Sequence, residues 1–352
     1  MSEQAYQQQR GGLLVLQSHS GVQLQDAGRF GVAGAGLTQG GAIDLTAARL
    51  ANALVGNHNT VQGQCQPVLE ITLGAVAFRA EQPLLLALTG AAMPMSVNSQ
   101  PVARYRSVLL QAGDLLEIGY SRAGARAYLA VAGGFDAPAV CGSVATVLRE
   151  KIGGPDGHGQ AITIGTTLSC EPWLRADPQI ALPYNQHYRH QSIRALPVVA
   201  GAQLAELDPA VALLLPKRLF RVTARSDRMG MQLGGEPLPV SAQQLYSEGI
   251  CLGAMQLPPN GLPIVMLNDH QTIGGYPKTG ALTRGACEQL GQMMTGQFVR
   301  FYWLDVADAV QQERQRLHAL QQLLDDLAAQ WQHFLQRTAA QHGASDEYTD
   351  VV

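Results

Sequence analysis

The segment YSEGICLGAMQLPPNGLPIVMLNDHQTIGGYPK, residues 246–278, contains the pattern on which the fold assignment of this chain rests. Its apolar run at residues 264–267 is short, with proline before it and asparagine after it. Such a run is typical of a buried strand that delivers polar side chains at its end. The pair Gly274 and Gly275 predicts a backbone turn that other residues enter less easily. A polar loop after a core strand is the alternative interpretation.

The same pattern of short strands extends outward from this segment through most of the chain. The runs are bounded by Gly, Pro or Asn and are seldom separated by helical patterns. They predict a mainly β protein, built from β-barrel or sandwich domains with a few inserted helices. The other runs lie at residues 13–16, 68–73, 84–88, 107–110, 115–118, 127–131, 194–199, 220–223 and 298–303.

One helix is predicted early in the chain. Asp44 is a suitable N-cap for a helix at residues 45–55, and Gly56 and Asn57 provide a stop signal. Apolar residues recur along this stretch at helical spacing, so one face of the helix is expected to pack against a core.

A long helix is predicted at residues 305–342, because glycine and proline are absent from residue 305 until Gly343. Its apolar residues recur at spacings of three and four. They fit either a terminal helix packed on its own domain or a coiled coil between chains. These residues are Leu317, Leu320, Leu324, Leu327, Trp331 and Phe334.

The length of 352 residues is sufficient for two domains of ordinary size. Residues 171–190 contain three prolines and a dense polar run, which is typical of a linker. We therefore expect a first domain at 1–185, a second at 186–304, the C-terminal helix at 305–342 and a flexible tail at 343–352.

Composition excludes several classes of protein. The net charge is −3 and no basic block occurs, which argues against nucleic acid as a partner. The N-terminus has no apolar core of a signal peptide, and no stretch is long and apolar enough to span a bilayer. A soluble cytoplasmic protein is the expectation. A charged fraction of only 14% suggests that a partner covers part of the surface.

Cysteine and histidine give no sign of a metal site or a disulfide. His187 and His190 lie close together but lack cysteine or carboxylate companions, so no metal is expected there. The cysteines are odd in number and form no CxxC pair, so reduced and mostly buried thiols are expected. They are Cys65, Cys141, Cys170, Cys251 and Cys287.

The common nucleotide-binding and hydrolase motifs are absent from the sequence. It contains no GxxxxGK[ST], no GxGxxG after a strand, no GxSxG and no HExxH. A glycine-rich loop at residues 34–41 leads to the helix capped by Asp44. Such a junction can hold an anion on free backbone N–H groups, although a tight turn is the alternative.

Over residues 13–303 the sequence resembles the KipA-like subunit of bacterial 5-oxoprolinase, a family also called allophanate hydrolase subunit 2. The resemblance rests on several strings that occur in the right order. It departs from the usual pattern at residues 22–24 and in a longer connection at residues 59–67. The strings include QDAGR at 25–29, GGAID at 40–44, RLAN at 49–52, LEIT at 69–72, RAYLAVAGGF at 126–135, SDRMG at 226–230 and GGYPK at 274–278.

This resemblance implies a fold, an activity and partners. The fold would be two tandem cyclophilin-like β-barrels. The partners would be two further subunits, one KipI-like and the other LamB/YcsF-like, and the complex would open 5-oxoproline to glutamate at the expense of ATP. Similar domains form part of the biotin-dependent carboxyltransferase region of urea carboxylase. None of the three lysines is flanked by methionine, so no covalent biotin is expected on this chain.

Activation of a lactam carbonyl by phosphate calls for cations, carboxylates and close-approach backbone N–H groups. Lys278 stands out, because only three of the 24 basic residues are lysines. Asp26 with Arg29, and Asp227 with Arg228, could instead fix turns as local ion pairs. The candidate catalytic residues are Asp269, Lys278, Asp26 and Asp227. The candidate substrate-binding residues are Arg29, Asp44, Arg49, Asn52, Arg228, Gln256, Gln271, Thr272, Gly274, Gly275 and Tyr276.

Two other functions remain open at this point. The chain could be part of a urea amidolyase or carboxyltransferase. It could also be a KipA-like regulatory binding protein that antagonises a KipI-like kinase inhibitor, without an activity of its own. The sequence does not distinguish which member of the complex would bind ATP.

Overall fold

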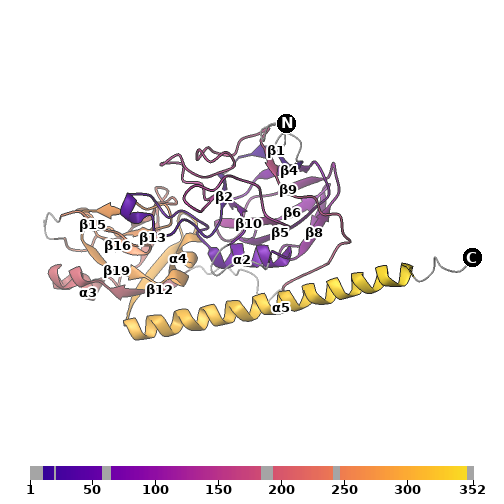
Figure 1. The fold of residues 1–352 in the computed structure, drawn as a ribbon. Coiled ribbons are helices and arrows are strands. Elements are labelled where there is room, and N and C mark those ends of the chain that lie inside the picture. The colour runs from indigo at the N-terminus through magenta and orange to yellow at the C-terminus, as the bar shows by residue number, and fades with distance from the viewer. Residues whose placement is uncertain (1–10, 20, 58–64, 184–192, 241–245, 347–352) are drawn as a thin grey trace, which may run out of the picture.

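The computed structural model describes residues 11–19, 21–57, 65–183, 193–240 and 246–346. Its first domain is built on two antiparallel sheets (Figure 1). Six strands are ordered β11-β1-β4-β9-β6-β7, and five are ordered β2-β3-β10-β5-β8. The strands are β1 Gly12–Ser18, β2 Val22–Gln25, β3 Val68–Thr72, β4 Val76–Ala80, β5 Leu84–Gly90, β6 Met95–Val97, β7 Gln100–Val102, β8 Ser107–Leu110, β9 Leu115–Ile118, β10 Arg126–Val131 and β11 Thr167–Ser169.

Strand β5 shows why both faces of the five-stranded sheet are buried. Leu84, Leu86 and Leu88 point into the core between the two sheets. Leu85 and Ala87 point the other way, toward helix α2 (Leu45–Leu54). Because side chains alternate along a strand, a sheet covered on both faces needs a continuous apolar run. The layers are therefore sheet, sheet and helix.

The second domain is a closed seven-stranded barrel, ordered β12-β19-β16-β17-β14-β13-β20. Strands β12 and β20 pair in parallel, and the other neighbours are antiparallel. Closure satisfies the backbone groups that an open edge would leave unpaired. The strands are β12 Ile193–Ala200, β13 Phe220–Val222, β14 Gly230–Gly234, β16 Ala254–Gln256, β17 Ile264–Met266, β19 Lys278–Leu282 and β20 Phe298–Leu304.

Smaller elements decorate this barrel. Helix α4 (Arg284–Gly291) packs Ala286, Cys287 and Leu290 into the core cluster of the barrel, and the side chain of Ile43 from the first domain joins the same cluster. The two-stranded sheet β15–β18 lies apart from the barrel ladder. The smaller elements of the chain are α3 Pro209–Leu214, α4 Arg284–Gly291, β15 Glu248–Gly249, β18 Ile273–Gly274 and the 3-10 helices η1 Ala33–Ala35 and η3 Ala202–Glu206.

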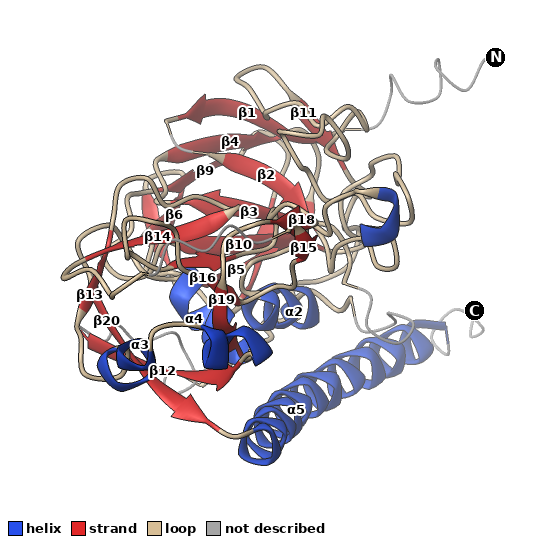
Figure 2. Ribbon diagram, turned by 90° about the vertical axis from the view of Figure 1, so that its left-hand side faces the viewer, coloured by secondary structure: helices blue, strands red, loops and turns tan. Residues whose placement is uncertain are grey.

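Helix α5, Val306–Asp346, runs beneath both domains (Figures 1 and 2). Leu320, Leu327 and Trp331 belong to the same buried cluster as α2. The indole N–H of Trp331 donates to the carbonyl of Ala53 at 2.9 Å. The helix therefore packs on its own chain, but these contacts are to α2 of the first domain rather than to the adjacent second domain. It extends through Gly343, beyond the predicted end at residue 342.

The mainly β architecture, the early helix and its Asp44 cap are confirmed. Within the described residues, no helix is long and apolar enough to cross a membrane. The predicted domain boundary at 185/186 and the pair His187 and His190 lie outside the described residues.

Candidate functional site

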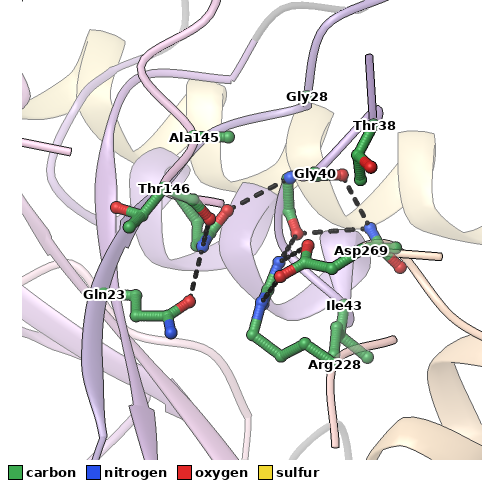
Figure 3. A network of polar contacts seen from close by, with 12 residues as sticks. Gln23, Gly28, Thr38, Gly40, Ile43, Ala145, Thr146, Arg228 and Asp269 are labelled. Atoms are coloured by element: carbon green, nitrogen blue, oxygen red, sulfur yellow. Dashed lines mark hydrogen bonds and ion pairs between the residues drawn. The ribbon is translucent and has the colours of Figure 1, made fainter. Parts of the chain in front are cut away.

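Arg228 joins the two domains through a buried set of contacts (Figure 3). It lies in the turn between β13 and β14, and its guanidinium donates from Nε and Nη2 to the two carboxylate oxygens of Asp269, both at 2.9 Å. Nη2 also donates to the carbonyl of Gly41 at 2.8 Å, and Nη1 donates to Glu70. Gly41 and Glu70 belong to the first domain, so Arg228 and Asp269 act as a clamp between the domains. We call this set of contacts the seam.

Glu70, on β3, is the central anion of the seam and is only 2% exposed. Its carboxylate accepts from the Ile43 N–H at 3.0 Å and the Tyr128 hydroxyl at 2.9 Å. Burial by itself would raise the pKa of Glu70, but the guanidinium groups of Arg228 and Arg126 outweigh burial and lower it. Glu70 was not among the predicted site residues. Its signal was a carboxylate in the middle of the apolar strand VLEIT.

The glycine-rich loop before α2 is held against the second domain by Asn268. The Asn268 amide donates to the carbonyls of Gly40, Gly41 and Ala42 at 3.1–3.2 Å. The N–H groups of Gly40 and Gly41 donate to the Asn268 carbonyl and to the Gln25 side chain. These donors are therefore engaged within the chain, and the tight-turn interpretation of the loop is correct rather than the anion site.

Asp44 also lies where the domains meet. Its carboxylate caps α2 by accepting from the Ala47 N–H at 2.9 Å, and it accepts from the Gln292 amide at 2.8 Å. Burial and the nearby carboxylate of Glu288 raise the pKa of Asp44 to about 7. The predicted residue thus has a capping role and an unusual titration near neutral pH.

A cleft of about 630 Å³ opens on the first domain, and it contains two of the predicted site residues, Asp26 and Arg49. Arg49 and Leu45 both line it, because residues four apart share one face of α2. The remaining lining comes from the loops around the start of the helix. It consists of Ala27, Gly28, Phe30, Cys65, Gln66, Pro67, Ala139, Cys141, Gly142, Ser143 and Val144.

One wall of the cleft is a tight turn at residues 140–143 that Asp26 fixes in place. Val140 and Ser143 pair through their backbones. The Asp26 carboxylate accepts from the Gly28 N–H at 2.7 Å, the Ser143 hydroxyl at 2.6 Å and the Val144 N–H at 2.9 Å. These contacts fit the turn-fixing alternative for Asp26.

Arg29 lies beneath the same turn and is 1% exposed. Nε donates to the Val140 carbonyl at 3.2 Å, and Nη2 donates to the carbonyls of Ser143 at 3.4 Å and Ala145 at 2.6 Å. Burial lowers the pKa of Arg29 from its ordinary value. Arg29 is not among the lining residues of the cleft, and it supports the cleft wall from beneath.

Asn52 supports the opposite wall. Its amide donates to the Cys65 sulfur at 3.1 Å and to the Gln66 carbonyl at 3.0 Å, and both of these residues line the cleft. Asn52 is itself 3% exposed. Of the RLAN string at residues 49–52, Arg49 therefore reaches the cleft, while Asn52 positions its lining.

Asp227 and Lys278 are engaged elsewhere in the second domain. Asp227 accepts from the N–H groups of Met229 and Gly230 at 2.8 and 3.1 Å, which fixes the turn that carries Arg228. Lys278, at the start of β19, pairs with Glu248 at 3.0 Å. Lys278 and Asp269 were both predicted to be catalytic, and the structure gives each a different ionic partner.

Gly274, near Lys278, lies in a closely packed place rather than in an unusual turn. Neither Gly274 nor Gly275 has a positive φ angle. A Cβ on Gly274 would lie 2.5 Å from Cδ1 of Ile250 and 2.8 Å from Nε2 of Gln256. The turn was predicted from a conformation that only glycine enters easily, and neither glycine adopts that conformation. A side chain at Gly274 would instead have to displace the ends of the Ile250 and Gln256 side chains. Gln271, Thr272 and Tyr276 flank this point and are half-buried or exposed.

Other candidate chemistry is limited in the described part of the chain. Within it, no group of three or more His, Cys, Asp or Glu side chains could hold a metal ion. Three of the five free cysteines are buried, and Cys141 and Cys251 are exposed.

Comparisons with known proteins agree with this architecture. Residues 35–303 match the model of the carboxyltransferase domain, subdomain A and B. The chain belongs to this family. It is 34% identical over 305 residues to a 5-oxoprolinase subunit of Escherichia coli K12, covering 85% of this chain and 94% of that protein. A 5-oxoprolinase subunit of Haemophilus influenzae is 30% identical over 313 residues, which cover 88% of this chain and 96% of that protein.

A solved structure of similar fold is the K. lactis urea amidolyase, with a TM-score of 0.79 and 24% identity. The match covers 90% of the present chain and 20% of the urea amidolyase chain. The chain thus corresponds to about a fifth of that larger protein.

Proposed function

We propose that this protein is one subunit of a 5-oxoprolinase-type complex, which opens 5-oxo-L-proline to L-glutamate with consumption of ATP. The observation that carries the proposal is the similarity to the E. coli 5-oxoprolinase subunit, which extends over nearly the whole of that protein. The proposed partners are a KipI-like protein and a LamB/YcsF-like protein, as the other members of the complex.

The chemistry explains why such a complex would use ATP. The lactam is a resonance-stabilised amide with a poor leaving group, and transfer of a phosphoryl group to its carbonyl oxygen activates it for attack by water. Cations and oriented donors then stabilise the charge that develops. This chain offers arginine at the first-domain cleft and Lys278 at the surface of the barrel.

The contacts suggest how the predicted catalytic residues divide their roles. Both oxygens of Asp269 accept from Arg228, so we assign Asp269 to holding the domains together. The Lys278 side chain is 18% exposed and its ionic partner Glu248 is 53% exposed, so Lys278 can still reach a substrate or a partner protein. We propose that Lys278 is the residue of the second domain that takes part in the ring-opening reaction.

A reconstitution experiment tests the function. The three purified proteins are mixed with ATP and 5-oxoproline, and glutamate and ADP are measured together. Both products should form in equal amounts and should vanish when this chain is omitted. Equal activity without this chain would refute the proposal.

A carboxyltransferase on a urea-like substrate is the second candidate, because the chain is also 26% identical to the urea amidolyase of Lachancea kluyveri over 85% of its own length. That activity would require a biotinyl carrier and bicarbonate, whereas the 5-oxoprolinase reaction would not. A purely regulatory KipA-like role would give binding to the KipI-like protein but no consumption of ATP when 5-oxoproline is added.

A further inference from the structure

The first-domain cleft carries an excess of positive charge. Arg49 lines it, and the buried guanidinium of Arg29 lies behind the turn at residues 140–143. Nη1 of Arg29 has no hydrogen-bond partner among the described residues, and the partners of its other nitrogens are backbone carbonyls. The lining contains one carboxylate, Asp26, so the guanidinium groups of Arg49 and Arg29 outnumber it by two to one. The Asp26 oxygens already accept three hydrogen bonds from the chain. An anionic group is therefore favoured in the cleft.

The rest of the lining mixes apolar side chains with groups that can form hydrogen bonds. Phe30 is 67% exposed and stands at the cleft with Leu45 and Pro67. Gln66 offers both a donor and an acceptor. A compact apolar ring that carries an amide and a carboxylate matches this combination, because specific small-molecule sites join apolar walls to a few placed polar groups.

We propose that this cleft binds a small carboxylate-bearing lactam, with the ligand carboxylate on Arg49 and its ring against Phe30 and Leu45. The proposal rests on the proposed function, for which 5-oxoproline is the ligand of this class. It places substrate recognition in the first domain, over the start of α2, rather than on the Gly274–Lys278 segment.

Two exposed cysteines allow the cleft to be tested by protection from alkylation. Cys141 lines the cleft, whereas Cys251 is exposed in the second domain and serves as an internal control. The alkylation rates of both thiols by iodoacetamide are measured by mass spectrometry, on the full chain and on the assembled complex. At ten times its Kd, 5-oxoproline should slow alkylation of Cys141 about tenfold by occupancy and leave Cys251 unchanged.

Variants test the assignment of the ligand carboxylate. Arg49→Gln should weaken the protection by 5-oxoproline about tenfold or more, because a hydrogen bond between charged groups is lost. Arg79→Gln, on the exposed position of β4, is the matched control and should bind normally. Phe30→Ala is a second variant that does not put folding at risk, because Phe30 is exposed, and it should also weaken protection.

The outcomes separate this proposal from the proposed function. Unchanged alkylation of Cys141 in an active complex would overturn the cleft assignment and leave the function standing. Protection of Cys141 without ATP-dependent ring opening would support the cleft and refute the function. 2-Pyrrolidinone, the same ring without the carboxylate, should protect weakly, and protection equal to that by 5-oxoproline would overturn the role of Arg49.

Discussion

The seam and the cleft both use arginine and aspartate, but they use them in opposite ways. In the seam, Arg228 has carboxylates and a carbonyl around its guanidinium, and Glu70 is enclosed. In the cleft, Arg49 faces a cavity, and the guanidinium of Arg29 behind it donates only to backbone carbonyls, which carry no net charge. A charge that is paired and buried on all sides specifies the arrangement of the domains, whereas a charge at the wall of a cavity can meet a ligand.

The largest effect is expected when the central carboxylate of the seam, Glu70, is neutralised. Glu70→Gln leaves the guanidinium groups of Arg228 and Arg126 without their shared carboxylate, and it should reduce the free energy of unfolding by about 3–5 kcal/mol. The matched control is Glu236→Gln, which breaks the surface ion pair with Arg218 and should cost less than about 1 kcal/mol. Urea denaturation measures both. Equal losses in the two variants would show that the seam is not the stronger contact.

A smaller effect should appear in the pH dependence of stability. The pKa of Asp44 is about 7 in the folded protein and near 3.8 in the unfolded chain. A raised carboxyl pKa favours the folded state at low pH, so this contribution is present below about pH 4 and is lost as the pH rises through about 7.

Asp44→Asn should therefore remove a negative slope of up to about 1.4 kcal/mol per pH unit between those limits, while an amide still caps α2. Thermal unfolding of both proteins at several pH values measures the slope. A variant with the same slope as the native protein would assign the titration to another group.

The smallest change in stability is expected on replacement of Lys278, whose ion pair is more exposed than those of the seam. Lys278→Ala removes one pair with a half-exposed carboxylate and should cost less than about 1 kcal/mol. If the proposed role is correct, the reconstituted complex should nevertheless lose about 100-fold or more in ring opening, while its members stay associated. Lys217→Ala, at an exposed position, is the control. Full activity of the Lys278 variant would show that Lys278 takes no part in the reaction.

Local structure was predictable where one stretch of sequence determines it. Asp44 as a cap, the buried run at residues 84–88 and the apolar face of α5 follow from propensity and periodicity, and each is present in the structure. The turns fixed by Asp26 and Asp227 were also foreseen as alternatives to catalysis.

The parts that could not be predicted depend on contacts between distant residues. Glu70 and Arg228 are 158 positions apart, and no local pattern shows that they pair. The sequence predicted a backbone turn at Gly274, but its close neighbours are the side chains of Ile250 and Gln256, which approach it only after the chain has folded. Pairing across the chain decides which charged residues are structural.

Helix α5 has a consequence for the order in which the protein forms during synthesis. It follows both domains in the sequence, and it supplies Leu327 and Trp331, which cover α2 in the first domain. The outer face of α2 therefore stays open to water until α5 has left the ribosome, although domains generally fold from the N-terminus first. Emergence of this helix, rather than completion of either domain, is the step at which that surface becomes covered.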